Sequence, residues 1–129
     1  MAKWSEVKQY LNDNYTISDQ KQDWVKLEFE TEDDRTQLVF VEKEESKTGN
    51  NWIKISSPIG VVEQYDIPDI LYGSVVTFGE IIIEDNGLLT LRHAIKAETL
   101  SYDEFERAMS YLAMVADSIE AQFIGGDKY

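Results

Sequence analysis

A β-hairpin followed by a long helix is the strongest structural signal in this sequence. Two apolar runs, Ile81–Glu84 and Leu88–Lys96, flank the turn residues Asp85-Asn-Gly87. Asn-Gly tolerates the positive φ angles that a tight hairpin turn requires. Ser101 and Glu104 then form a capping box, in which each side chain satisfies a free backbone amide of the first helical turn. The sequence therefore predicts antiparallel strands with a helix packed on them.

The segment after Ser101 has the period of an amphipathic helix. Its apolar residues recur every three or four positions and trace one face: Phe105, Met109, Leu112, Ala116, Ile119 and Phe123. Such a stripe indicates that one side of the helix is buried. Gly125-Gly126 is a typical end signal for a helix.

The first half of the chain predicts a helix and three strands. Residues 3–14 carry apolar and aromatic residues at helical spacing. Trp24–Thr31 alternates between apolar and charged residues, as a strand with one buried face does. Gln37–Glu44 is apolar on both faces, which favours a central position in a sheet. Trp52–Ser56 is expected to be the third strand.

A second helix is predicted between the two groups of strands. Residues 66–78 change to helical spacing, and Asp66 with Pro68 suits a helix start. The apolar stripe of this helix consists of Ile67, Ile70, Leu71, Val75 and Phe78. The expected order is thus α-βββ-α-ββ-α, an α+β fold in one domain covering residues 1–129.

Composition and charge narrow the classes of partner. The 129 residues carry a net charge of −13, which opposes binding to nucleic acid phosphates and to anionic membranes. There is no cysteine, so disulfides and thiol catalysis are excluded. The N-terminus has no apolar run behind it, unlike a signal peptide, and no run is long enough to cross a membrane. A cytoplasmic protein that binds neither nucleic acid nor membrane is expected.

No residues are arranged like a catalytic or metal site. His93, the one histidine, shares its strand face with Leu89, Leu91 and Ile95, which indicates a histidine at the edge of a core. The stretch Glu28–Glu45 has eight acidic and two basic residues, net −6, and lacks calcium-loop spacing. No phosphate-binding, dinucleotide or hydrolase motif occurs. We therefore expect no catalytic residues, no cofactor and no metal.

Two tryptophans stand on polar strand faces. Trp24 shares its face with Lys26 and Glu28, and Trp52 shares its face with Lys54 and Ser56. Because tryptophan is enriched in binding hot spots, these indoles are candidate contacts for a partner. The alternative is that the N-terminal helix, with Trp4 and Tyr10, covers one or both of them.

The C-terminal half resembles a known family. The pattern runs from Thr77-Phe-Gly-Glu-Ile-Ile-Ile-Glu-Asp-Asn-Gly-Leu-Leu-Thr-Leu-Arg92 to Leu100-Ser-Tyr-Asp-Glu-Phe-Glu-Arg-Ala-Met109 and then Ala116-Asp117. It is similar to the YbjN family and to the wider set of type III secretion chaperone-like domains. The resemblance covers about fifty residues; the N-terminal half agrees in element order and acidity.

The resemblance implies a homodimeric α+β domain that holds an extended segment of a client protein. By position, it implies a dimer contact at Ile67, Ile70, Leu71 and Val75. It implies a client surface near Trp4, Trp24 and Trp52.

The expected function is a non-enzymatic, chaperone-like module that binds a protein client, a basic one given the acidic surface. The alternatives are a regulatory or sensory adaptor of the YbjN type and a small enzyme whose site has no recognisable motif.

Overall fold

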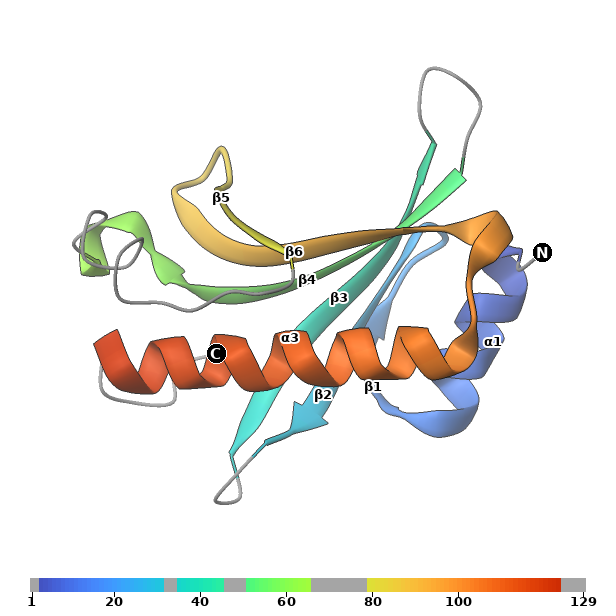
Figure 1. The fold of residues 1–129 in the computed structure, drawn as a ribbon, viewed down its shortest axis with the longest axis horizontal. Helices are drawn as coiled ribbons and strands as arrows, with labels where there is room; N and C mark the ends of the chain where they lie inside the picture. The colour runs from blue at the N-terminus through green and yellow to red at the C-terminus, as the bar shows by residue number, and fades with distance from the viewer. Residues whose placement is uncertain (1–2, 32–34, 46–50, 66–78, 124–129) are drawn as a thin grey trace.

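The computed structural model describes residues 3–31, 35–45, 51–65 and 79–123 (Figure 1). In these ranges six strands form one open antiparallel sheet in the order β1-β2-β3-β4-β6-β5, and two α-helices pack on it. The predicted α+β class is therefore confirmed. The predicted helix over residues 66–78, with Ile67, Ile70, Leu71 and Val75, lies outside the described ranges.

The described elements include one strand that was not predicted and two short 3-10 turns, and the predicted order as a whole is not tested because its middle helix lies outside the described ranges. They are α1 (Trp4–Asn14), β1 (Thr16–Gln20), β2 (Trp24–Glu30), β3 (Thr36–Glu45), β4 (Asn51–Val61), η2 (Val62–Gln64), β5 (Glu80–Ile83), β6 (Leu88–Lys96), η3 (Ala97–Thr99) and α3 (Tyr102–Phe123). The N-terminal helix, the three strands that follow β1, the hairpin and the C-terminal helix were all predicted. β3 lies between β2 and β4, as its two apolar faces indicated.

Strand β1 was not predicted, because its sequence has almost no apolar alternation. Only Ile17 of Thr16–Gln20 is partly buried, and the other four residues are exposed. The strand exists because it pairs with β2 along one edge of the sheet, through Ile17 opposite Leu27 and Gln20 opposite Val25. A tertiary contact thus decides its conformation.

Strand β4 extends well beyond the predicted Ser56. Pro58 and Gly60 discourage a strand prediction, since proline cannot donate to the ladder and glycine weakens a strand. The sheet accommodates them through a shift in register between these two residues, opposite Thr90 and Leu89 of β6. Ile59 between them is fully buried.

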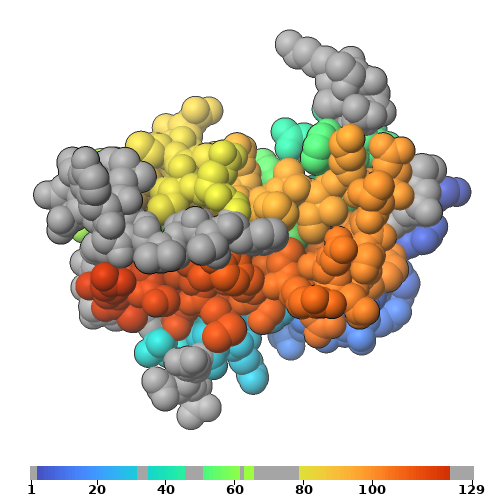
Figure 2. Space-filling model, in the orientation of Figure 1, coloured from blue at the N-terminus to red at the C-terminus, as the bar shows by residue number. Residues whose placement is uncertain are grey.

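One face of the sheet forms the core with both helices. Val25 and Leu27 of β2 and Ile53 and Ile55 of β4 are at most 1% exposed. β3 and β6 contribute the equivalent buried residues Val39, Val41, Leu89 and Leu91. From α3 the predicted stripe Phe105, Met109, Leu112, Ala116 and Ile119 is buried against them, whereas the side chain of Phe123 lies outside the described part. The space-filling view shows side chains of α3 beside those of β6 (Figure 2).

The N-terminal helix lies on the same face as α3 (Figure 1). Its residues Val7 and Leu11 are fully buried, and the ring of Tyr10 stacks on Tyr102 of α3 with centroids 4.3 Å apart. The Tyr15 ring contacts Phe29 of β2 at 5.3 Å. Together α1 and α3 cover one side of the sheet and leave the other side without a helix in the described ranges.

The predicted turn is present, and of the predicted capping box one of the two hydrogen bonds is present. In the hairpin the Glu84 N–H donates to Leu88 O and the Gly87 N–H to Glu84 O, and Gly87 has a φ of 81°. At the start of α3 the Glu104 N–H donates to Ser101 Oγ at 3.4 Å. Local chemistry is therefore sufficient to place these two features.

An ion pair that the sequence did not indicate ties α3 to Arg35, the residue just before β3. Nε and Nη2 of Arg35 donate to the carboxylate of Asp117, with Nη2 to Oδ2 at 2.8 Å. Asp117 is 5% exposed, so its charge is largely removed from water and needs this partner. The contact joins residues 82 positions apart, which is why no local pattern points to it.

We expect Leu112→Ala to lower the free energy of unfolding by about 2–5 kcal/mol, because it opens a cavity under α3. Ser101→Ala removes only one capping bond and should cost about 1 kcal/mol. Met114→Ala, at a position that is 46% exposed on the same helix, is the control and should change stability by less than about 0.5 kcal/mol. Urea melts in which Leu112→Ala is no worse than Ser101→Ala would contradict the packing.

Candidate functional site

The sheet face opposite the helices carries a mixture of aromatic and charged side chains. Strand alternation places Trp24, Phe40, Trp52 and Arg92 on this face, since their neighbours in sequence point into the core. No described helix covers it (Figure 1). We call this surface the open face.

A groove of about 470 Å³ lies on the open face where the β5–β6 turn approaches it. Its aromatic part consists of Trp24 and Phe40, whose ring centroids are 6.3 Å apart at an interplanar angle of 54°. The described residues that line it are Trp24, Phe40, Glu42, Ser56, Pro58, Glu84, Asp85, Asn86, Leu88 and Thr90. We call it the Trp24 groove.

A second hollow of about 340 Å³ lies further along the same face. It is lined by Glu44, Trp52, Lys54, Glu80, Arg92 and Ala94. Arg92 pairs with Glu80 at 2.5 Å, and Lys54 pairs with Glu42, a residue of the Trp24 groove, also at 2.5 Å. The Lys96 ammonium lies 5.7 Å from the Trp52 ring centroid. We call it the Trp52 hollow.

The structure brings two of the three predicted tryptophans together. Trp24 pairs with Glu42 of β3. Trp52 pairs with Glu44, two residues further along that strand but from its other side. Two strand spacings and two residues separate the indoles, about 12 Å by standard sheet dimensions. Both side chains are partly buried, and α1 lies on the opposite face from them.

Trp4 does not join this pair. Its side chain packs against the core cluster on the helix side, and its indole Nε1 donates to Gln22 O at 2.7 Å. Lys8 of the same helix donates to Lys21 O at 2.7 Å. The geometry gives Trp4 a role in holding α1 to the β1–β2 connection.

Sequence reasoning missed most of the groove that surrounds Trp24. The sequence indicated an apolar residue at Phe40, because β3 is apolar on both faces. Pro58, Leu88 and Thr90, in contrast, come from strands that are distant from Trp24 in sequence. Only the strand order β2-β3-β4-β6 places them beside one another.

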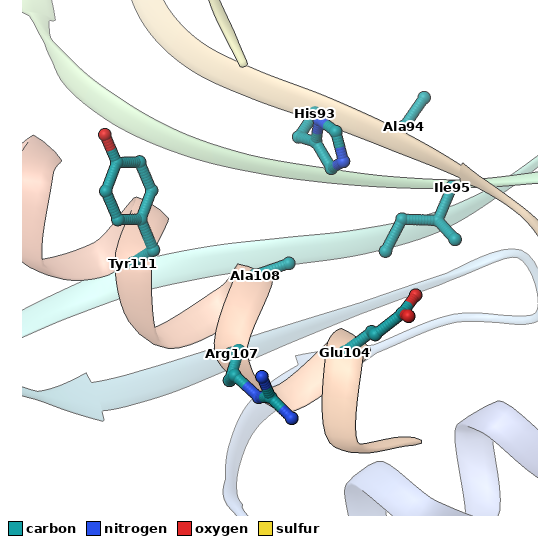
Figure 3. Close-up of a pocket in the computed structure, with 7 residues that line it drawn as sticks. All are labelled: His93, Ala94, Ile95, Glu104, Arg107, Ala108 and Tyr111. Atoms are coloured by element: carbon teal, nitrogen blue, oxygen red, sulfur yellow. The ribbon is translucent and has the colours of Figure 1, made fainter. Parts of the chain in front are cut away.

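A third cavity, of about 460 Å³, lies on the helix side between β6 and α3 (Figure 3). His93, Ala94 and Ile95 of β6 line it from the sheet. Glu104, Arg107, Ala108 and Tyr111 line it from the helix. β5 pairs with β6 only as far as Arg92, so the residues of β6 that line this cavity pair with β4 and have no described strand on their other side.

The polar groups of this cavity are spread along its wall. The Arg107 guanidinium points away from His93, and the Tyr111 hydroxyl lies at the far end (Figure 3). Burial lowers the pKa of His93 below its ordinary value of 6.5, so the imidazole is neutral near pH 7. In the described ranges no group of three or more His, Asp or Glu side chains is arranged to hold a metal ion.

Comparisons of the chain with protein-family models, with curated proteins and with solved structures found no match. Within the described residues, neither helix is long and apolar enough to cross a membrane. The chemistry of the surfaces is therefore the basis for inferring function.

The lowered pKa of His93 predicts a pH-dependent stability. As pH falls through about 6.5, the unfolded chain takes up a proton that the folded chain resists, so the free energy of unfolding decreases. His93→Gln lacks this proton uptake. We expect the stability advantage of wild type over His93→Gln to shrink between about pH 7.5 and pH 5.5. Urea melts showing a constant difference over that range would contradict a desolvated histidine.

Proposed function

We propose that this protein is a non-enzymatic, chaperone-like module that binds an extended segment of another protein on its open face. The observation that carries the proposal is a sheet surface that no described helix covers, with two partly buried indoles beside two hollows. Antiparallel sheets with one solvated face normally carry polar side chains there. Large aromatic residues at the centre of such a face are the residue types that dominate binding energy at interfaces.

The spacing of the indoles suits an extended peptide. A strand-like segment rises about 3.3 Å per residue, so about four residues cover the 12 Å between Trp24 and Trp52. The segment would contact the Trp24 groove at one end and the Trp52 hollow at the other. The Lys54–Glu42 ion pair lies between the two recesses.

Charge on and around the open face favours a basic client. Glu28 and Glu30 are exposed on β2, and Glu44 is exposed on β3. With the chain's net charge of −13, these carboxylates accelerate encounter with a cationic segment and repel acidic ones.

In YbjN proteins and secretion chaperone-like domains, which the sequence resembles, apolar patches near the first helix and the sheet hold the client segment. The proposal keeps the sheet part of that surface, because α1 lies on the opposite face. A regulatory adaptor of the YbjN type would use this surface without export. The chaperone-like module and the regulatory adaptor share one binding mode and differ only in what happens to the bound protein.

A small enzyme is the competing class. It would need polar groups that converge on one point of a cavity. The cavity between β6 and α3 contains the one histidine of the chain, and there His93, Arg107 and Tyr111 are spread along the wall. This arrangement favours binding over catalysis.

Substituting the indoles tests the binding surface. Peptides selected from a random display library on the wild-type protein serve as ligands. Trp24→Ala and Trp52→Ala should each raise the dissociation rate about 30-fold, the equivalent of about 2 kcal/mol at a hot spot. Association should slow as salt rises, because steering is screened over about 8 Å at physiological ionic strength. Met114→Ala on α3 is the control.

Unchanged dissociation in both folded tryptophan variants would remove the open face as the binding surface. Chemical-shift changes confined to Ala108 and Tyr111 on peptide binding would assign binding to the cavity between β6 and α3 instead.

We also infer a homodimer, on the basis of the resemblance and of the apolar stripe Ile67, Ile70, Leu71 and Val75. An isologous contact would bury this stripe from both copies. Analytical ultracentrifugation should show a dimer at micromolar concentration. A monomer at high micromolar concentration would refute the inference without affecting the peptide-binding proposal.

A further inference from the structure

We propose that the Trp24 groove is a subsite for an arginine side chain of the bound segment. The inference rests on the proposed peptide-binding function and adds the chemistry that one position of the peptide must have. It is carried by the charge of the groove lining, by the aromatic wall and by the unsatisfied hydroxyl of a residue in the lining.

The charged residues among the described lining of the Trp24 groove are all acidic. They are Glu42, Glu84 and Asp85, and the described lining includes no Lys or Arg. Glu42 is neutralised by Lys54 from outside the groove. The ion pairs of the described residues include neither Glu84 nor Asp85, so these two carboxylates at the hairpin end are available to a ligand.

The wall and floor suit the rest of an arginine side chain. The Trp24 indole offers a π face, whereas Phe40 already has the Lys26 ammonium 5.9 Å from its ring centroid. Pro58 and Leu88 provide apolar surface for the methylene stem. Thr90 is 4% exposed, and its Oγ1 has no hydrogen-bond partner. A buried hydroxyl without a partner is costly, and an incoming N–H donor relieves that cost.

Arginine fits this combination better than lysine. Its planar guanidinium stacks on an aromatic face while its fork of N–H groups donates to carboxylates. Lysine supplies the charge without the planar stacking surface.

The Trp52 hollow differs from the Trp24 groove in its balance of charge. The arginine subsite is therefore assigned to the Trp24 end of the open face. The lining of the Trp52 hollow contains Lys54 and Arg92 as well as Glu44 and Glu80. Arg92 and Glu80 already pair with each other. Its charges are thus balanced within the protein, and it is suited to an apolar side chain beside Trp52.

The test compares peptides that differ at one side chain. Library peptides selected on the full-length protein should be enriched in arginine. Replacing that arginine with citrulline, which has nearly the same shape but no charge, should weaken binding about ten-fold or more. Lysine should give an intermediate loss. Glu84→Gln with Asp85→Asn should abolish the preference, so that the arginine and citrulline peptides bind equally.

A matched pair of substitutions controls for overall charge. Glu98→Gln with Glu106→Gln removes the same two charges from exposed positions outside the groove. This variant should keep the preference for arginine. If it loses the preference to the same extent as the groove variant, the effect is long-range steering and the subsite is refuted.

The outcomes separate this inference from the function on which it rests. Equal binding of arginine and citrulline peptides to wild type, with affinity still lost in Trp24→Ala and Trp52→Ala, would overturn the arginine subsite and leave the binding function standing. Absence of any bound peptide, or binding that ignores both tryptophans, would overturn both.

Discussion

Burial of a single face of the sheet is the constraint on which the rest of this structure depends. The stripe of α3 from Phe105 to Ile119 covers the inward residues of β3, β4 and β6, and α1 covers the β2 end through Val7 and Leu11. Both helices lie on that side (Figure 1). Because side chains alternate along a strand, a residue that faces the core places its neighbours on the open face. The surface available to a partner is therefore a consequence of how the core is packed.

That surface combines features that a purely solvated face does not need. Trp24 and Phe40 lie together, Trp52 stands beside the Lys96 ammonium, and ion pairs separate the two recesses. The hairpin of β5 and β6 contributes Glu84 and Asp85 to the rim of the Trp24 groove, although these residues are some 60 positions from Trp24. The hairpin turn that the sequence predicts thus supplies the acidic end of the proposed binding surface.

Prediction from sequence succeeded where the signal was local and failed where it was not. The Asp85-Asn-Gly87 turn, the Ser101 cap and the alternation of β2 each involve residues within a few positions of one another, and all are present. β1 has one partly buried residue and forms only by pairing with β2. β4 passes through Pro58 and Gly60 because β6 tolerates a shift in register there. The Arg35–Asp117 pair spans 82 positions and had no local signature.

The sequence by itself determined the α+β class, the central position of β3, the hairpin and capped helix, and the polar faces on which Trp24 and Trp52 stand. These follow from periodicity and turn chemistry, which act between near neighbours along the chain. Only the tertiary structure decided that both indoles share the face that no described helix covers and that Trp4 lies on the other side. It alone brought Pro58, Leu88 and Thr90 beside Trp24, because strand order and helix placement are fixed by long-range packing that no local pattern encodes.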